Sequence, residues 1–450
     1  MVVMSREPTV KQSIALGLTM SLLIVLARAE NPEHWPAWRG TNGNGIAPAD
    51  AQPPIKWDEK TNIQWKVELP GKGSATPVVW GDQVFVLTAT PTKREAKPEE
   101  LPPRDTRFET KTQAPTRFYQ FEVLSFNRTT GKVRWRQIAN EAVPHEGHHP
   151  THSYAAGSPA TDGKRLYVSF GSFGTYAYDL TGKLLWKRDL GRLHTRLGWG
   201  EAVTPVVYGD SVILNLDQET DSRLVALDAS TGNIRWEVKR DEKTSWNTPI
   251  VVKHGDSVQI IVNGTNRVRS YDLATGKPIW EVSGMTTNAI PSPLTHGGFA
   301  YVTSGYRGAA ALAIPLDSKG DLGDGTGKVA WKYSKGTPYV PSPLLLNGRL
   351  YMTKGNTQLL TVLDAKSGKP ILEDERLPKA TSFYASPAAA NGHVYLVDRN
   401  GTTVVLKDGD KPLVVSVNSL NDPIDASPVF SGKTLFLRGE KYLYAIAGSN

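Results

Sequence analysis

The histidine-rich segment at residues 144–157 holds side chains suited to binding a metal ion. Four of the nine histidines in the 450-residue chain fall in it: His145, His148, His149 and His152. The stretch from His145 to His149 has the HExxH spacing of zinc proteases, which requires a helix to place both imidazoles on one side. Pro144 and Pro150 favour a loop here, so we expect no protease and treat the four histidines as metal ligands or as hydrogen-bonded loop residues.

A tryptophan, carboxylates and an arginine form a second candidate site. The run Arg-Asp-Glu-Lys-Thr-Ser-Trp ends at Trp246, and we expect it to share a face with two residues earlier in the chain. Tryptophan could stack on a ring-shaped or sugar-like ligand while the charged groups hydrogen-bond to it. A salt-bridge network within the loop is the alternative interpretation. The candidate residues are Trp199, Asp217, Arg240, Glu242 and Trp246.

Basic residues recur at comparable turns of successive repeats and form a third candidate site. Arg267 is the first of them, and the others are Arg307, Lys354, Arg399 and Arg438. Together they would make a cationic funnel for an anionic ligand or for an acidic surface of a protein partner. The alternative is that they are solvated turn residues.

The composition excludes several other kinds of site. The chain has no cysteine, which excludes disulfides, thiolate metal sites and a lipid anchor on cysteine. The formal net charge of +8 is mild, and basic residues alternate with acidic ones, unlike the basic and aromatic platforms of nucleic-acid-binding proteins. Nucleophile-elbow and phosphate-loop motifs are absent from the sequence. We therefore expect no nucleic-acid partner, and we assign no catalytic residue and no cofactor from the residues alone.

A recurring Ser/Thr-Pro dipeptide defines the elements that must position these candidates. Its prolines are Pro77, Pro159, Pro205, Pro249, Pro293, Pro343, Pro387 and Pro428. After a first gap of 82 residues the spacing is 41 to 50 residues, a period typical of β-propeller blades. The first gap contains residues 90–117, rich in proline and charge, which we expect to be a solvated loop inserted into the first blade.

The second half of most repeats contains a tight turn with a glycine and, four residues later, a tryptophan. The pairs are Gly131/Trp135, Gly182/Trp186, Gly232/Trp236, Gly276/Trp280 and Gly327/Trp331, and Gly368/Leu372 keeps the spacing without the indole. Glycine supplies the positive φ of such a turn, and a preceding Asp or Asn can bind the turn backbone. We expect the tryptophans to pack between adjacent blades.

The eighth repeat ends before its fourth strand, and residues 62–68 have the pattern of that missing strand. The sequence therefore predicts an all-β, eight-bladed propeller of four-stranded antiparallel blades, closed by an N-terminal strand. Closure of this kind leaves only short, protected strand edges. We place the propeller domain at residues 30–450.

Residues 1–29 have the features of a secretory signal peptide. Arg6 and Lys11 precede an uncharged stretch from Ile14 to Leu26, and a small-residue cleavage signal follows. An uncleaved anchor is the alternative, although this stretch is too short to span a bilayer as a helix. We therefore expect an exported monomer, periplasmic or secreted, without a membrane span.

The repeat resembles that of a known superfamily. The run from Ala226 to Trp236, repeated from Tyr271 to Trp280, resembles the tryptophan-docking repeat of pyrroloquinoline quinone (PQQ) propellers. The stretch from Trp35 to Gly40 resembles the start of secreted PQQ-like repeat proteins. The resemblance covers nearly the whole mature chain. That superfamily contains quinoprotein alcohol dehydrogenases and also noncatalytic proteins, among them the outer-membrane assembly scaffold of Gram-negative bacteria, so the repeat implies the fold and leaves the chemistry open.

Two functions follow as expectations from this resemblance. The first is a noncatalytic binding or scaffolding propeller that holds a protein, a glycan or an anionic ligand at its loop face. We use this term for the face where the connections into the first strand of each blade and the turns between its second and third strands emerge. The alternative is a PQQ- and calcium-dependent oxidoreductase, which would need a quinone stacked on tryptophan, calcium held by carboxylate and amide oxygens, and an aspartate base. The sequence assigns no residue to these three roles.

Overall fold

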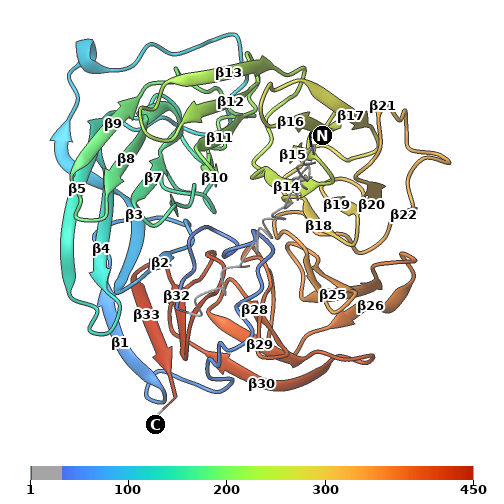
Figure 1. Ribbon diagram of the computed structural model, residues 1–450. Coiled ribbons are helices and arrows are strands. Elements are labelled where there is room, and N and C mark those ends of the chain that lie inside the picture. Colours follow the sequence, from blue (N-terminus) through green and yellow to red (C-terminus); the bar gives the residue numbers. More distant parts are fainter. Residues whose placement is uncertain (1, 3–32, 449–450) are drawn as a thin grey trace. The chain divides into compact units, whose positions relative to one another are not determined.

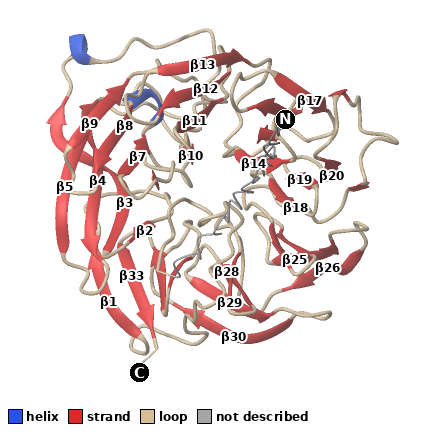
Figure 2. Ribbon diagram, viewed as in Figure 1, coloured by secondary structure: helices blue, strands red, loops and turns tan. Residues whose placement is uncertain are grey.

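The computed structural model describes residues 2 and 33–448, and the chain from residue 33 onward folds into eight sheets arranged in a ring (Figure 1). The predicted signal peptide lies, apart from Val2, outside the described residues. Among the described residues no helix has the length and apolar character needed to cross a membrane. The predicted eight-bladed, all-β propeller is confirmed, and Figure 2 shows that strands and loops make up almost all of it.

The first four blades follow one another along the chain. Blade one has β2 (Val78–Trp80), β3 (Gln83–Glu95), β4 (Arg117–Asn127) and β5 (Val133–Ala142). Blade two has β6 (Ala160–Thr161), β7 (Arg165–Ser169), β8 (Thr175–Asp179) and β9 (Leu184–Arg188). Blade three has β10 (Val206–Tyr208), β11 (Ser211–Leu216), β12 (Arg223–Asp228) and β13 (Ile234–Lys239). Blade four has β14 (Ile250–His254), β15 (Ser257–Val262), β16 (Val268–Asp272), β17 (Pro278–Val282) and the added β21 (Gly320–Asp321).

The last four blades continue in the same sense. Blade five has β18 (Leu294–His296), β19 (Phe299–Ser304), β20 (Ala310–Pro315) and β22 (Trp331–Tyr333). Blade six has β23 (Leu344–Leu346), β24 (Arg349–Thr353), β25 (Leu359–Asp364) and β26 (Pro370–Arg376). Blade seven has β27 (Ala388–Ala390), β28 (His393–Val397), β29 (Thr402–Lys407) and β30 (Leu413–Ser419). Blade eight has β31 (Val429–Ser431), β32 (Thr434–Arg438), β33 (Tyr442–Ala447) and β1 (Ile63–Glu68). Two short 3₁₀ turns complete the described elements, at Pro98–Glu100 and Gly171–Phe173.

The ring closes through β1, as the sequence predicted. Strand β1 pairs antiparallel with β33, with Lys66 opposite Tyr444 and Glu68 opposite Tyr442. The strand is half-buried and exposed in alternation, as a rim strand should be. Middle strands such as β11 are buried along their whole length because neighbouring blades cover both of their faces.

The Ser/Thr-Pro dipeptides link the blades by hydrogen bonds around the axis. The backbone N–H of the Ser or Thr in one blade donates to the side-chain hydroxyl of its counterpart in the next, at 2.8 to 3.1 Å. The bond from Ser427 N–H to Thr76 Oγ1 joins the last blade to the first. Seven such bonds are formed, so the repeated dipeptide is a belt that ties the inner ends of the blades together.

The tryptophan and glycine repeats form the second link between blades. The indole of Trp186 on β9 lies against Gly232 in the turn of the following blade, and its Nε1 donates to Ala229 O at 3.1 Å. The same arrangement joins Trp65 to Gly131, Trp135 to Gly182, Trp236 to Gly276 and Trp331 to Gly368. Trp280 instead donates to Gln259 of its own blade at 3.2 Å. The predicted packing of tryptophans between blades is thus confirmed at five of the joints.

The segment inserted into blade one differs from the prediction at its ends and in its contacts. Strand β3 continues through Thr90 to Glu95 and pairs with β4 as far as Glu95, which lies opposite Arg117. The remaining loop does not lie wholly in solvent. Lys111 N–H donates to Leu197 O at 2.9 Å, and Thr112 Oγ1 donates to Gly198 O, so the loop packs on the connection between blades two and three.

Candidate functional site

A cavity of about 550 Å³ opens at the centre of the ring and is the candidate binding site. The hydroxyl-bearing residues of the belt, including Thr76, Ser158 and Ser427, lie in its wall, which places it on the propeller axis. The N-terminal segment contributes Trp38, whose Nε1 donates to Ser427 Oγ at 3.4 Å. Arg39, next to it, is buried and donates to the carbonyl oxygens of two inner-strand prolines, at 2.7 and 2.9 Å. These contacts fix the N-terminal segment against the inner strands.

One position of the repeat faces the cavity in every blade. The residue three places before each recurring proline lines the cavity wall: Ser74, Ala156, Ala202, Trp246, Ile290, Val340, Tyr384 and Asp425. The backbone there leads into the innermost strand, so its side chain is aimed at the axis. Small residues occupy this position in blades one to three, and larger ones in blades four to eight. The side chain at this position therefore takes up least space in blades one to three.

Aromatic rings form a continuous stretch of the wall. Trp199 stacks with Trp246, with ring centroids 6.4 Å apart, and meets Tyr306 edge-on at 6.5 Å. Tyr306 stacks with Tyr339 at 4.9 Å. The Trp246 indole is held in place because its Nε1 donates to Gly200 O at 2.7 Å. All four rings line the cavity.

The charged groups of the wall neutralise each other. Arg399 donates to both carboxylate oxygens of Asp425, at 2.7 and 3.2 Å, and its guanidinium lies 4.1 Å from the centre of the Tyr384 ring. His149 contacts Trp199 edge-on, and burial, followed by the charge of Arg399, lowers the pKa of His149. The imidazole is thus uncharged near neutral pH. Among the described wall residues, Arg399 and Asp425 are the lone arginine or lysine and the lone carboxylate, so the wall carries no net charge.

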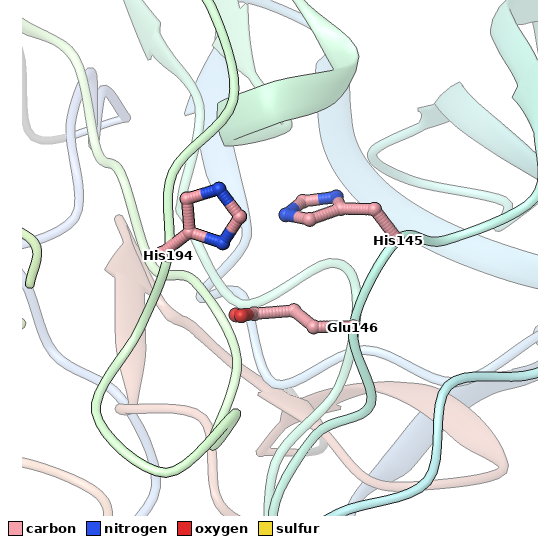
Figure 3. Close-up of side chains that lie close together, drawn as sticks. All are labelled: His145, Glu146 and His194. Atoms are coloured by element: carbon pink, nitrogen blue, oxygen red, sulfur yellow. The ribbon is translucent and has the colours of Figure 1, made fainter. Parts of the chain in front are cut away.

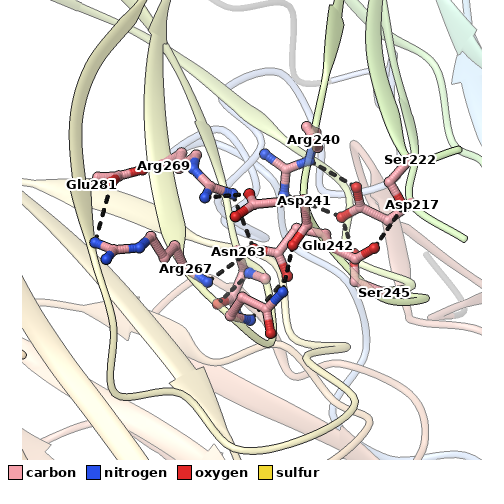
Figure 4. A network of polar contacts seen from close by, with 12 residues as sticks. Asp217, Ser222, Arg240, Asp241, Glu242, Ser245, Asn263, Arg267, Arg269 and Glu281 are labelled. Atoms are coloured by element: carbon pink, nitrogen blue, oxygen red, sulfur yellow. Dashed lines mark hydrogen bonds and ion pairs between the residues drawn. The ribbon is translucent and has the colours of Figure 1, made fainter. Parts of the chain in front are cut away.

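The other polar residues of the second candidate site lie in the protein interior (Figure 4). Arg240 and Asp217 form a fully buried ion pair at 2.7 Å, and Arg240 also donates to the Tyr271 hydroxyl at 2.6 Å. Glu242 accepts a hydrogen bond from the backbone N–H of Arg267 and forms an ion pair with Arg269. Burial raises the pKa of Glu242, and the Arg240 charge opposes this. These groups hold blades three and four together, which matches the alternative of a salt-bridge network.

The predicted basic residues do not form one cationic ring. Arg399 lies in the cavity wall, whereas Arg438 is buried, donates to Ala75 O at 3.0 Å, and has its pKa lowered by burial to about 9. Arg267 pairs with Asp321 and Glu281 at the rim, and Arg307 lies 5.3 Å from the Tyr306 ring centre. Lys354 is half-buried, and its backbone N–H pairs with Leu359 O next to the turn after β24.

The four clustered histidines point in different directions. The segment is a loop, as expected, and His149 lines the cavity while His148 Nδ1 bonds to its own loop backbone. His152 Nε2 donates to Glu201 O at 3.0 Å, and burial lowers the pKa of His152 to about 4. His145 lies close to Glu146 and His194 (Figure 3). The structure therefore does not join these four residues in one metal site.

Two buried carboxyl groups lie beside this loop. Burial raises the pKa of Glu146 to about 7, against hydrogen bonds from the hydroxyl and N–H of Thr195. Burial likewise raises the pKa of Glu201 to about 8, against hydrogen bonds from Ser172. An enclosed cavity of about 20 Å³ lies next to both carboxyl groups, with room for one water molecule.

Sequence reasoning placed Trp199, Trp246, Arg399, His149 and His152 among the candidates, and all five line the cavity. It did not identify Trp38, Tyr306, Tyr339, Tyr384 and Asp425. A signal for part of this set exists in the sequence, since Tyr384 and Asp425 stand three places before a recurring proline. Trp38 comes from outside the repeats, and no repeat position indicates it.

Comparisons with known proteins agree with the fold. Residues 120–314 and 264–450 match a family model described as "Outer membrane protein assembly factor BamB". A curated relative, the lanthanide-dependent methanol dehydrogenase of Methylorubrum extorquens, is 27% identical over 232 residues, which is 47% of this chain and 33% of that protein. The chain thus spans about a third of the length of that relative.

Solved structures with the same architecture include both scaffold and enzyme. BamB from Moraxella catarrhalis gives a TM-score of 0.55 at 12% identity, over 85% of this chain and 98% of that one. A europium-containing methanol dehydrogenase gives 0.63 at 11%, over 93% and 99%. The quinohemoprotein alcohol dehydrogenase of Comamonas testosteroni gives 0.64 at 10%, over 94% and 82%. At these identities the likeness shows the fold alone. Because the family model covers well over half of the sequence, the chain belongs to the PQQ-like β-propeller repeat family whose model is described as the outer membrane protein assembly factor BamB.

Proposed function

We propose that this protein is an exported, noncatalytic binding propeller whose central cavity holds a neutral saccharide. The observation that carries the proposal is the wall itself, a cavity of about 550 Å³ that has no net charge and is lined by a series of tryptophan and tyrosine rings. Its volume falls within the range of small-molecule sites. Export rests on the N-terminal signal pattern, and the propeller acts as a monomer in this proposal.

The chemistry of the wall suits a sugar ring. The apolar face of a pyranose can lie on the flat ring of Trp199 or Trp246, while its hydroxyl groups need donors and acceptors at the edges. Arg399 and Asp425 supply both, and belt residues such as Ser427 and Thr76 also line the cavity. An anionic ligand would gain little electrostatic attraction here because the guanidinium of Arg399 is already paired with the carboxylate of Asp425.

The wall does not fit PQQ with calcium. PQQ carries three carboxylates, and calcium takes six to eight oxygen ligands that usually include several carboxylates. Among the described wall residues the one carboxylate, Asp425, is engaged by Arg399, and no further arginine or lysine faces the cavity. The donor set for a calcium-bound tricarboxylate is therefore not present in this wall, and we derive no redox chemistry from it.

Calorimetric titration of the mature protein with a panel of neutral oligosaccharides tests the proposal. Trp199→Ala removes one stacking face, worth about 1 to 2 kcal/mol, so the affinity should fall roughly 5- to 30-fold. Ala202→Trp should abolish binding because it replaces a small side chain of the cavity wall with an indole. Trp65→Phe is the control, since Trp65 packs at a blade joint away from the cavity.

Two results would contradict the proposal. One is the absence of saccharide binding together with a saturable rise in unfolding temperature that needs both PQQ and calcium, which would favour the oxidoreductase. The other is saccharide binding that Ala202→Trp leaves unchanged, which would place the ligand elsewhere. If neither ligand binds, a protein partner at the loop face becomes the function to pursue.

A further inference from the structure

We propose that His145, Glu146 and His194, from the loop after β5 and the connection between β9 and β10, form a binding site for a divalent transition metal ion. The candidate ligand atoms of these three residues all lie within 4.8 Å of one another. Figure 3 shows the Glu146 carboxylate and one ring nitrogen of each histidine turned toward the same gap. Two imidazoles and one carboxylate are the protein ligands of many zinc sites, in which water takes the fourth position.

Local contacts orient two of the three ligands. Asp105, from the loop inserted into blade one, is hydrogen-bonded to Arg107 and lies 3.6 Å from Nε2 of His194. This nitrogen therefore faces a carboxylate, and Nδ1 is left to bind a metal. A carboxylate behind a histidine ligand is the usual arrangement that fixes the tautomer and the ring orientation. The Glu146 carboxylate accepts the N–H and the hydroxyl of Thr195, the residue next to His194. These bonds fix the position of the Glu146 carboxylate relative to His194.

The site is sheltered yet reachable. The side chains of His145 and His194 are 5% and 22% exposed, and Glu146 is buried. The small enclosed cavity lined by His145 and Glu146 adjoins the cluster and could hold the water of the fourth position. His145 Nε2 donates to Leu193 O at 2.8 Å, so coordination through this nitrogen exchanges that hydrogen bond for a metal bond.

The geometry gives the metal a structural consequence. His145 and Glu146 lie in the loop at residues 144–157, and His194 lies in the connection between blades two and three. Asp105 belongs to the inserted loop of blade one. The loop at residues 144–157 also carries His149 of the cavity wall, and the connection between blades two and three carries Trp199. A bound ion would cross-link these loops and fix the wall on that side. None of the three proposed ligands lines the central cavity, so the metal site is independent of the ligand that the cavity binds.

Titration of the chelator-treated, full-length mature protein with Zn²⁺, followed by calorimetry, tests the site. One ion should bind per chain, and His194→Ala should weaken binding at least 100-fold because it removes a direct ligand. Asp105→Asn should weaken it about tenfold, since it removes only the orienting carboxylate. His296→Ala, an exposed histidine on another blade, should bind as the wild type does. Thermal unfolding of each variant without Zn²⁺ shows whether it is folded.

Cobalt substitution gives a second, spectroscopic readout of the same site. Co²⁺ bound to two imidazoles and a carboxylate in the wild-type protein should give visible absorption bands, and these should be absent from His194→Ala. The proposal is overturned if the wild type binds no Zn²⁺, or if folded His194→Ala binds as tightly as the wild type. It is also overturned if His148→Ala or His152→Ala removes the bound ion, because the ligands would then be the other histidines of the loop.

Discussion

Replacing Gly232 by alanine tests how the blades are joined. Gly232 has φ of +69°, and a Cβ added there would lie 2.7 Å from Cδ2 and Cε3 of the Trp186 indole. Gly327 is a matched control, since it has the same φ of +69° in the equivalent turn and no heavy atom within 4 Å of an added Cβ. Both substitutions carry the backbone cost of a left-handed alanine, about 1 to 2 kcal/mol.

The two variants differ in what the new methyl group meets. At Gly232 the indole must move, which costs about 1 to 3 kcal/mol in overpacking and weakens the bond from Trp186 Nε1 to Ala229 O, worth about 1 kcal/mol. We therefore expect Gly232→Ala to cost about 2 to 4 kcal/mol more than Gly327→Ala. For a chain of about 420 folded residues, 1 kcal/mol corresponds to roughly 1 °C of unfolding temperature.

Differential scanning calorimetry measures this difference, with Gly232→Ala expected to unfold about 2 to 4 °C below Gly327→Ala. A Trp186→Leu background provides a double-mutant cycle, because blade six carries Leu372 in place of tryptophan. In that background the alanine at Gly232 should cost no more than it does at Gly327. Equal losses for the two single variants would refute the view that indole packing on glycine holds the blades together.

Three further predictions concern the belt and the buried ion pairs. Ser342→Ala should cost about 1 to 3 kcal/mol by leaving a buried backbone N–H of the preceding blade unpaired, and Ser342→Thr should restore most of it, as chemical denaturation will show. Burial raises the pKa of Asp408, but hydrogen bonds, foremost from Arg349, outweigh it and lower the pKa. The carboxylate therefore stabilises the fold above its unfolded pKa of about 4 and loses this effect as the pH falls, so Asp408→Asn should cost more at pH 7 than at pH 3 in denaturant melts. Arg240→Met should destabilise by about 3 to 5 kcal/mol because it strands the buried Asp217 carboxylate, and the double variant with Asp217→Leu should regain much of that loss; an unchanged melting temperature for the single variant would contradict this.

The repeat made the architecture predictable, because each blade reuses the same local chemistry. The spacing of the Ser/Thr-Pro dipeptides gave the number of blades, and the pattern of β1 gave the closure. The sequence did not predict that Trp280 hydrogen-bonds to Gln259 of its own blade instead of to the next blade, since this bond depends on packing within blade four. Nor did it reveal the added strand β21, which depends on how the loop after β20 folds back onto β17.

The candidate site was less predictable because its residues come from many loops. The aromatic wall includes Trp199 and Trp246, which were candidates, but its extent depends on Tyr306 and Tyr339 from blade five and its neighbour. The clustered histidines separate because tertiary contacts set the direction of each side chain in a loop without regular structure. The partner that joins His145 is His194, which belongs to a different loop and has no motif to mark it.

The position three residues before each recurring proline has an evolutionary and engineering consequence. The belt uses only backbone N–H groups and the Ser or Thr two residues later, so the cavity-facing side chain takes no part in these bonds. Four of the eight cavity-facing side chains do bond to neighbouring segments, namely Ser74, Trp246, Tyr384 and Asp425. A library that keeps these four and varies Ala156, Ala202, Ile290 and Val340 should retain the propeller while it diversifies the ligands that the cavity binds.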